Sequence, residues 1–199
     1  MIGIVDYGAG NLRSVKKALD FLGAESRIVA APGEIEGIEK MILPGVGAFR
    51  AAMEKLQEKD LFRPVAEWLA ADRPFLGICL GMQILFESGE ESPEVPGFGI
   101  FRGAVPRFRQ GRVPQIGWNR VRFSRPTLLS EGLEDGAFFY FLHGYYVAPQ
   151  EASIVCGETE YGIRYPSMIR RGNIYAVQFH PEKSADNGLK LLQNWVDLS

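Results

Sequence analysis

Residues 73–89 read Arg-Pro-Phe-Leu-Gly-Ile-Cys-Leu-Gly-Met-Gln-Ile-Leu-Phe-Glu-Ser-Gly, an apolar strand that we expect to run without a loop into an apolar-periodic helix. Cys79 stands at the joint, with Gly77 before it and Gly81 after it. This is the spacing of a nucleophile elbow, with cysteine in place of serine. A side chain at either glycine would clash in so tight a turn. The pattern predicts an exposed cysteine at a helix N-terminus, where the helix dipole favours a thiolate.

A buried thiol in a packed core is the alternative interpretation of Cys79. Unpaired cysteines are among the most buried residues, so this would be the better prediction for an arbitrary cysteine. The two flanking glycines reverse that preference, because a core thiol has no need of them.

The composition describes an ordinary globular protein. With 199 residues, 46% of them hydrophobic, the chain suits a single domain over residues 1–199. Lys and Arg number 22 against 24 Asp and Glu, so no overall charge points to nucleic acid or to a membrane surface. Met1 leads into Ile-Gly-Ile-Val with no signal-peptide or membrane-spanning pattern, and we expect a cytoplasmic protein.

The two cysteines, Cys79 and Cys156, are expected to be reduced thiols in such a protein. Cys156 lies in a β-like run and is predicted to belong to the core. The two histidines and two cysteines are widely separated and lack the spacing of a zinc site. The sequence therefore indicates neither a metal nor a cofactor.

The first half alternates short apolar strands with helical patterns. Strands are expected at residues 2–6, 26–30, 41–43 and from residue 75, separated by apolar helical periodicities over residues 12–22, 49–56 and 61–69. Asn11 is the expected N-cap of the first helix, and Gly23 closes it. This alternation predicts an α/β fold with a doubly wound, mostly parallel sheet of the flavodoxin-like kind.

The carboxyl ends of parallel strands meet at one edge of a sheet, where ligand sites form. Residues 8–10 and 45–47 are Gly-rich strand ends, so we expect both to lie beside Cys79. The run Gly8-Ala9-Gly10 also raises the alternative of a dinucleotide fingerprint. Arg13 occupies its third glycine position, and the strand at 26–30 ends without an acidic residue, so this alternative is disfavoured.

The second half changes character after Gly89. A loop is expected over residues 90–96, and β-like runs follow to residue 179, with a closing helix over 186–198. We therefore expect an added antiparallel β section. Seven arginines make its first part locally basic, which is typical of a solvated face but would also suit docking of an acidic partner; they are Arg102, Arg107, Arg109, Arg112, Arg120, Arg122 and Arg125.

A cysteine nucleophile needs a base, and His180 has the better surroundings of the two histidines. It follows an apolar strand, and Glu182 two residues later can accept from one imidazole nitrogen and so fix the tautomer. His143 has no neighbouring acid and is predicted to be structural. The residues thus predict a triad of Cys79, His180 and Glu182.

At this point the chain resembles the class I, triad-type glutamine amidotransferases, and among them the glutaminase subunits of imidazole glycerol phosphate synthase. The resemblance covers essentially the whole chain. It is carried by residues 6–12 (Asp-Tyr-Gly-Ala-Gly-Asn-Leu), 44–49 (Pro-Gly-Val-Gly-Ala-Phe), 77–83 (Gly-Ile-Cys-Leu-Gly-Met-Gln), 117–119 (Gly-Trp-Asn) and 178–184 (Gln-Phe-His-Pro-Glu-Lys-Ser). The elbow and His-Pro-Glu are common to the superfamily, whereas the first, fourth and fifth stretches favour this branch.

The resemblance implies that Cys79 attacks the carboxamide of glutamine while His180 delivers a proton to the departing ammonia. The developing oxyanion would be held by backbone amides of Leu80 and of the strand end at Val46 and Gly47. By the same match, the glutamine would be bound by Gly45, Gln83, Gly144 and Tyr145.

The resemblance also implies a partner, a (β/α)₈-barrel cyclase subunit that receives the ammonia in histidine biosynthesis. The expected contact face includes Asn11, Trp118, Tyr140 and Lys183. Two alternatives stay open. One is the glutaminase subunit of another synthase, of the anthranilate, purine or pyridoxal phosphate pathway. The other is a non-catalytic flavodoxin-like module that holds a metabolite at residues 8–10.

Overall fold

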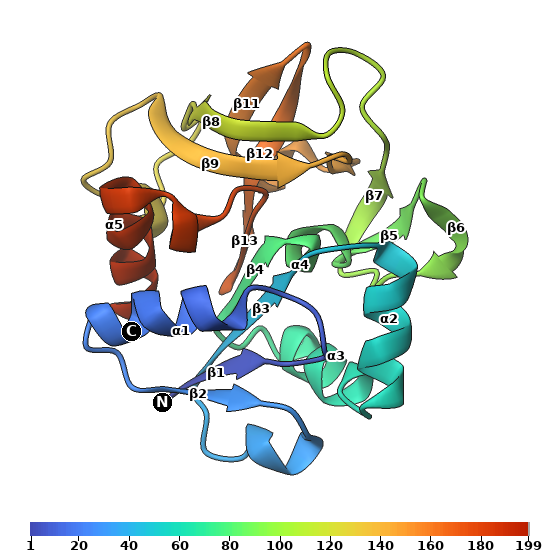
Figure 1. The fold of residues 1–199 in the computed structure, drawn as a ribbon, viewed down its shortest axis with the longest axis vertical. Helices are drawn as coiled ribbons and strands as arrows, with labels where there is room; N and C mark the ends of the chain where they lie inside the picture. Colours follow the sequence, from blue (N-terminus) through green and yellow to red (C-terminus); the bar gives the residue numbers. More distant parts are fainter. Residues whose placement is uncertain (199) are drawn as a thin grey trace.

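A seven-stranded sheet forms the centre of the computed structural model, which describes residues 1–198 (Figure 1). Its strand order is β11-β12-β13-β4-β3-β1-β2. Five neighbouring strands are parallel: β1 (Ile2–Val5), β2 (Ser26–Val29), β3 (Lys40–Gly45), β4 (Phe75–Cys79) and β13 (Ile174–Val177). The remaining two, β11 (Val155–Tyr161) and β12 (Ile163–Arg171), extend the sheet antiparallel at one edge.

Helices cover both faces of this sheet, as expected for a doubly wound fold (Figure 1). Side chains of α1 (Leu12–Phe21) and α5 (Ala185–Val196) enter one core cluster. Side chains of α2 (Phe49–Glu58) and α3 (Phe62–Ala70) enter the other. Short 3₁₀ turns, η1 (Pro32–Ile35), η2 (Leu128–Ser130), η3 (Ala152–Ile154) and η4 (Pro181–Lys183), complete the connections. No helix within residues 1–198 is both long and apolar enough to cross a membrane.

Two small sheets make up the added β section. The order β10-β7-β5-β6 joins β5 (Phe86–Gly89), β6 (Ser92–Pro96), β7 (Phe101–Val105) and β10 (Ala148–Pro149). A separate antiparallel pair joins β8 (Gln115–Val121) and β9 (Ala137–His143). The loop expected over residues 90–96 is mostly strand β6, so that expectation is wrong. β6 pairs with β5 although it contains two prolines.

Two other local expectations need correction. The helix after the elbow, α4, spans only Leu80–Gln83, because the chain turns into β5 where the apolar periodicity had suggested more helix. Asn11 does occupy the N-cap position of α1, but its side chain makes no capping hydrogen bond. Gly23 follows the C-cap with φ +69°, as a helix-closing glycine does.

The sheet brings the expected segments together. In the order β4-β3-β1 the three strands are parallel, so their carboxyl ends lie side by side. Cys79 ends β4, Gly45 ends β3 in register with it, and residues 8–10 follow β1.

Candidate active site

Cys79 occupies a strained turn between β4 and α4. Its φ is +55°, in the left-handed region that residues with a side chain rarely adopt. The flanking glycines are required by close backbone contacts. A Cβ on Gly77 would lie 2.7 Å from the carbonyl oxygen of Gly81, and a Cβ on Gly81 would lie 1.9 Å from that of Leu43. The turn is therefore a nucleophile elbow in its backbone as well as in its spacing.

The thiol itself is buried, with Cys79 only 4% exposed, so the expectation of an exposed cysteine is wrong. Two neighbours enclose its sulfur: the carbonyl oxygen of Leu142 at 3.7 Å and the side-chain Nε2 of Gln178 at 3.6 Å. The end of β9 and the residue that follows β13 thus cover the sulfur.

A cavity of about 140 Å³ opens on the sulfur. It is lined by Cys79 together with most of the residues expected at the oxyanion and substrate positions: Val46, Gly47, Leu80, Gln83, Gly144 and Tyr145. Leu142 and His143 complete the lining. Gly45 does not line it, but pairs with Cys79 between β3 and β4.

His180 and Glu182 form a buried pair, each with a side chain 1% exposed. The imidazole Nδ1 lies 2.9 Å from Glu182 Oε1, and since a carboxylate only accepts, Nδ1 carries the hydrogen. Burial lowers the pKa of His180, but the charge of Cys79, the hydrogen bond to Glu182 and the charge of Glu182 outweigh this effect and raise the pKa to about 10. Nε2 has no well-aligned hydrogen-bond partner within residues 1–198.

The backbone around His180 is tied to β9. The His180 amide donates to the Tyr140 carbonyl at 2.9 Å, and the Tyr140 amide donates to Ser184 Oγ at 2.9 Å. Ser184 Oγ in turn donates to the His180 carbonyl at 2.6 Å. The strand that carries Tyr140 on its outer face therefore fixes the position of the imidazole.

His143 is 6% exposed and lies in a hydrogen-bonded network. Its Nδ1 lies 2.7 Å from the Tyr145 carbonyl, and its Nε2 lies 3.2 Å from the Tyr165 hydroxyl. Burial lowers the pKa of His143 to about 4, with the charge of His180 adding to the effect and the Tyr145 hydrogen bond opposing it. A neutral imidazole thus holds residues 143–145 in place at the cavity wall.

Three residues at this site were missed from the sequence: Leu142, Gln178 and Tyr7. Leu142 and Gln178 reach the sulfur from β9 and from the end of β13. Tyr7 is fully buried, and its hydroxyl lies against Gly45. Gln178 gave one usable signal, since it is a polar residue that interrupts an apolar strand just before His180.

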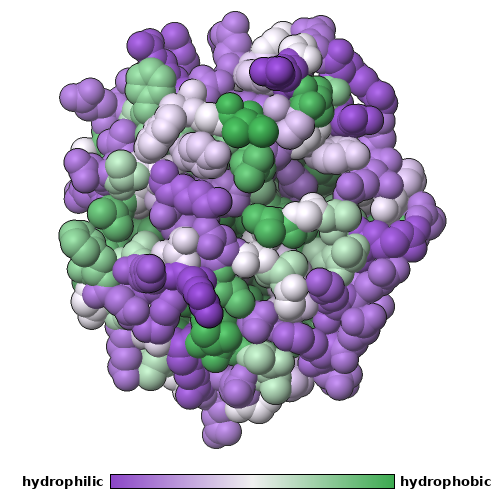
Figure 2. All heavy atoms as spheres, in the orientation of Figure 1, coloured by the Kyte–Doolittle hydropathy of each residue, from purple (hydrophilic) through white to green (hydrophobic). Residues whose placement is uncertain are grey.

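Three of the four residues expected to contact a partner lie together. The rings of Trp118 and Tyr140 pack edge to face with centroids 6.2 Å apart, and Lys183 Nζ lies 5.9 Å from the Tyr140 ring. Asn11 starts α1, which packs against η4. The outer face of β8 and β9, across the top of Figure 1, also exposes Ile116 and Phe138. The face drawn in Figure 2 carries several separate hydrophobic patches among hydrophilic side chains.

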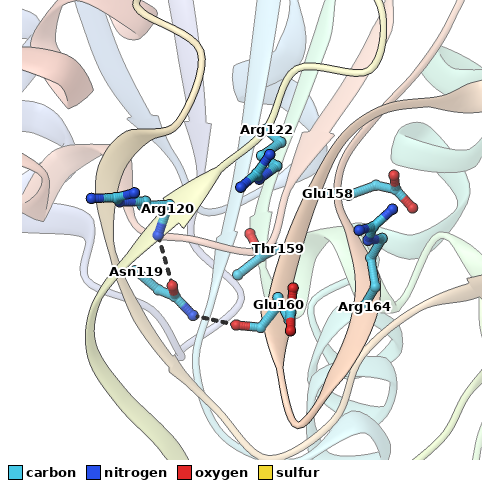
Figure 3. Close-up of a pocket in the computed structure, with 7 residues that line it drawn as sticks. All are labelled: Asn119, Arg120, Arg122, Glu158, Thr159, Glu160 and Arg164. Carbon is cyan, nitrogen blue, oxygen red and sulfur yellow. Dashed lines mark hydrogen bonds between the residues drawn. The ribbon is translucent and has the colours of Figure 1, made fainter.

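A second cavity, of about 190 Å³, lies between β8 and β11 (Figure 3). Its charged lining combines Arg120, Arg122 and Arg164 with Glu158 and Glu160, so both signs are present. Elsewhere in the basic stretch, Arg109 pairs with Glu90, and Arg125 donates to backbone carbonyls of residues 152 and 153. This mixture favours a solvated face over a basic docking surface.

Comparison with known proteins assigns the family. The family model for glutamine amidotransferase class-I matches residues 3–198. The chain therefore belongs to the class-I glutamine amidotransferases, as its sequence resemblance predicted. Two similar relatives within that family are subunits of imidazole glycerol phosphate synthase. The imidazole glycerol phosphate synthase subunit HisH of Desulfitobacterium hafniense (strain DSM 10664 / DCB-2) is 50% identical over 201 residues, covering 99% of this chain and 95% of the relative. HisH of Thermococcus kodakarensis is 50% identical over 200 residues, covering 98% of each.

Solved structures agree on the fold. A crystal structure of a glutamine amidotransferase superposes with a TM-score of 0.76 at 24% identity, covering 97% of this chain and 98% of the other. A chain of the PurLQS structure from Thermotoga maritima superposes with a TM-score of 0.77 at 20% identity, covering 98% and 97%. The predicted α/β fold, mostly parallel with an added antiparallel section, is confirmed.

Proposed function

We propose that this chain, as one domain over residues 1–199, hydrolyses glutamine to glutamate and ammonia for imidazole glycerol phosphate synthase in histidine biosynthesis. The observation that carries the proposal is a strained cysteine that lines a small cavity and whose charge acts on a buried imidazole–carboxylate pair. The HisH relatives at about half identity support the pathway.

In the proposed reaction the Cys79 thiolate attacks the carboxamide carbon of glutamine, and the carbonyl electron pair moves onto oxygen. The resulting oxyanion is held by the amide of Leu80, which has no acceptor within α4 because it is the first residue of that helix, and by an amide of Val46 or Gly47. His180, kept protonated by its raised pKa, gives a proton to the amine as the carbon–nitrogen bond breaks.

Ammonia leaves, and a thioester joins Cys79 to the glutamyl group. His180 then takes a proton from water, the hydroxide adds to the thioester, and the carbon–sulfur bond breaks to release glutamate and regenerate the thiolate. Glu182 holds the imidazole tautomer through both steps. Gln83, Gly144 and Tyr145, which line the cavity, bind the glutamine, and Gly45, which was expected to join them, supports the cavity from behind in β3.

Ammonia released into water at neutral pH would be mostly ammonium and unreactive, so we propose that a (β/α)₈-barrel cyclase covers the site and receives it. The outer face of β8 and β9 suits this contact, because Ile116, Trp118 and Phe138 are 62%, 53% and 45% exposed there. Leu142 belongs to the same β9 strand and lines the cavity. Lys183 flanks this face, since its Nζ lies 5.9 Å from the Tyr140 ring, and we include Asn11, at the start of α1, in the proposed contact.

We further propose that the amides of Val46 and Gly47 turn fully toward the substrate only when the cyclase is bound and occupied. Gly47, with φ +102° and no atom near its Cβ position, leaves this strand end free to change conformation. Two free cysteines fit a cytoplasmic enzyme. A glutaminase for another synthase is less well supported, because the relatives named above are HisH subunits.

Co-expression with a tagged barrel cyclase from the same organism tests the proposal. We expect the two chains to co-purify and glutamine hydrolysis to rise strongly when the cyclase holds its substrate, while the chain alone stays slow. Failure to bind the cyclase, together with binding to a chorismate-using or purine-synthesis enzyme, would assign a different pathway. Full-rate hydrolysis by the chain alone would contradict the proposed strand movement.

A further inference from the structure

Two buried amides connect the wall of the cavity to the sulfur of Cys79. Gln83 Nε2 donates to the Tyr145 carbonyl at 3.1 Å and to Gln178 Oε1 at 3.1 Å. Gln178 Nε2 lies 3.6 Å from Cys79 Sγ. Gln83 is 5% exposed and Gln178 is fully buried, so solvent does not compete for these groups.

The direction of this relay is fixed by its first member. An amide side chain can present either its oxygen or its nitrogen, but the Tyr145 backbone carbonyl only accepts, so the nitrogen of Gln83 must face it. Both hydrogens of that nitrogen are then used, one on Tyr145 and one on Gln178. Gln178 must therefore accept with its oxygen and turn its NH₂ group toward the sulfur.

A donor held against the sulfur favours the thiolate over the thiol, because hydrogen bonds to a charged acceptor are the stronger ones. The Leu142 carbonyl, 3.7 Å away, acts in the opposite sense, since it can accept from the thiol but not donate to the thiolate. We propose that Gln178 is a further catalytic residue, which stabilises the Cys79 thiolate through an N–H oriented by Gln83 and the Tyr145 carbonyl. The proposal rests on the proposed role of Cys79 as nucleophile.

The titratable groups near Cys79 do not duplicate the role proposed for Gln178, that of an uncharged donor to the sulfur. Burial raises the pKa of Tyr7 and of Tyr165, and the charge of Cys79 raises both values further. Both phenols are therefore uncharged near neutral pH. His143, its pKa lowered by burial, is neutral as well. His180 is a cation whose charge is coupled to that of Cys79, and Glu182 binds its other imidazole nitrogen, Nδ1. Gln178 is the uncharged donor that complements it.

The same geometry specifies how Gln83 binds a substrate. With both hydrogens engaged inside the protein, only Gln83 Oε1 remains to meet a ligand in the cavity. It is an acceptor, so it selects an N–H group of the ligand, such as the carboxamide nitrogen or an ammonium group.

The test is the pH dependence of Cys79 alkylation by iodoacetamide in the full-length chain, followed on the Cys79 peptide by mass spectrometry. For Gln178→Met we expect the midpoint of the rate profile to rise by about one pH unit and the rate at pH 7 to fall about tenfold, the size of one hydrogen bond to a charged group. Gln178→Glu keeps an acceptor for Gln83 but sets a carboxylate against the sulfur, so its midpoint should rise further. Gln193→Met, on α5 and bonded only to Asp197, is the matched control and should leave the midpoint unchanged.

Unchanged midpoints in both folded Gln178 variants would overturn the proposal, and if Gln178→Met does not fold, Gln178→Glu alone carries the same test. In the cyclase complex, Gln178→Met should lower kcat for glutamine about tenfold at pH 7 with little change in KM, and the deficit should shrink as the pH rises. A kcat deficit of the same size at every pH would instead indicate a merely structural role. A separate experiment tests the proposed glutaminase function. If glutamine is still used after Cys79→Ala, Cys79 is not the nucleophile, but the effect of Gln178 on the alkylation of Cys79 is unaffected by that result.

Discussion

The hydroxyl of Tyr7 lies 2.5 Å from the position that a Cβ on Gly45 would occupy. The same Cβ would lie 2.8 Å from Leu80 Cβ and 3.0 Å from the Gly81 nitrogen. Gly45 is thus the point at which β3 passes between Tyr7 and the nucleophile elbow. Its missing side chain lets the strand that carries the proposed oxyanion amides approach the turn that carries Cys79.

Gly45→Ala should therefore displace β3 from the elbow. Because the new methyl group meets backbone and core atoms, we expect a loss of about 1–3 kcal/mol in the free energy of unfolding. Glutamine hydrolysis in the cyclase complex should fall with it. Chemical denaturation and steady-state assays measure the two effects.

Gly33→Ala is the matched control, since a Cβ there meets no atom within 4 Å and should leave both quantities at the wild-type level. Wild-type stability and activity in Gly45→Ala would contradict the close packing at this strand.

Tyr7→Phe should leave the protein at least as stable as the wild type. The Tyr7 hydroxyl is buried with no hydrogen-bond partner within residues 1–198, and such a group costs about 1–3 kcal/mol. Tyr165→Phe is the comparison, because its hydroxyl donates to Gln115 Oε1 at 2.9 Å and its loss leaves that acceptor unpaired. Urea unfolding should place Tyr165→Phe below the wild type and Tyr7→Phe at or above it; the reverse order would show that the Tyr7 hydroxyl is bonded.

The parts of this site that could be read from the sequence are those built from neighbours in the chain. Cys79 lies two residues from each of its flanking glycines, and His180 lies two residues from Glu182. The spacing within each group was therefore enough to predict its chemical role. Leu142, Gln178 and Tyr7 reach the site from other elements, and nothing local in their sequence states which sulfur or strand they will contact.

The burial of Cys79 was missed for the same reason. The elbow spacing predicts a thiol at the end of a strand, but its exposure depends on residues 142–145, which are distant in the chain and pack over it. The length of α4 was overestimated because the apolar residues Ile84, Leu85 and Phe86 suit a buried helix and a buried strand equally well.

His143 should make the protein less stable in mild acid. Its pKa is about 4 in the folded chain against 6.5 as the ordinary value, so between these pH values the unfolded chain binds the proton and the folded chain does not. Stability from this group is complete above pH 6.5 and is lost as the pH falls toward 4. At 1.36 kcal/mol per pKa unit the difference amounts to about 3 kcal/mol.

His143→Gln keeps a donor for the Tyr145 carbonyl but does not titrate. Unfolding free energies at several pH values between 7 and 4.5 should therefore fall less steeply for His143→Gln than for the wild type. Parallel curves for the two proteins would mean that folding does not shift the pKa of His143.

Trp118→Ala should weaken binding of the cyclase, because a half-exposed aromatic ring packed on Tyr140 is the kind of anchor that dominates an interface. We expect a loss of about 2 kcal/mol, or roughly a 30-fold rise in Kd, measured by calorimetry. Phe21→Ala removes a ring that is 76% exposed on α1 and should not change the Kd. Equal effects of the two substitutions on the Kd would show that the outer face of β8 and β9 does not belong to the interface.

The most direct test of the account is the synthesis of imidazole glycerol phosphate by the cyclase complex carrying Cys79→Ala, measured with glutamine and, separately, with an ammonium salt. Cys156→Ala serves as control, since burial raises the pKa of the Cys156 thiol to about 12 and keeps it unreactive. We predict that Cys79→Ala abolishes synthesis from glutamine and preserves synthesis from ammonia, while Cys156→Ala preserves both. Synthesis from glutamine that survives in Cys79→Ala would contradict the account.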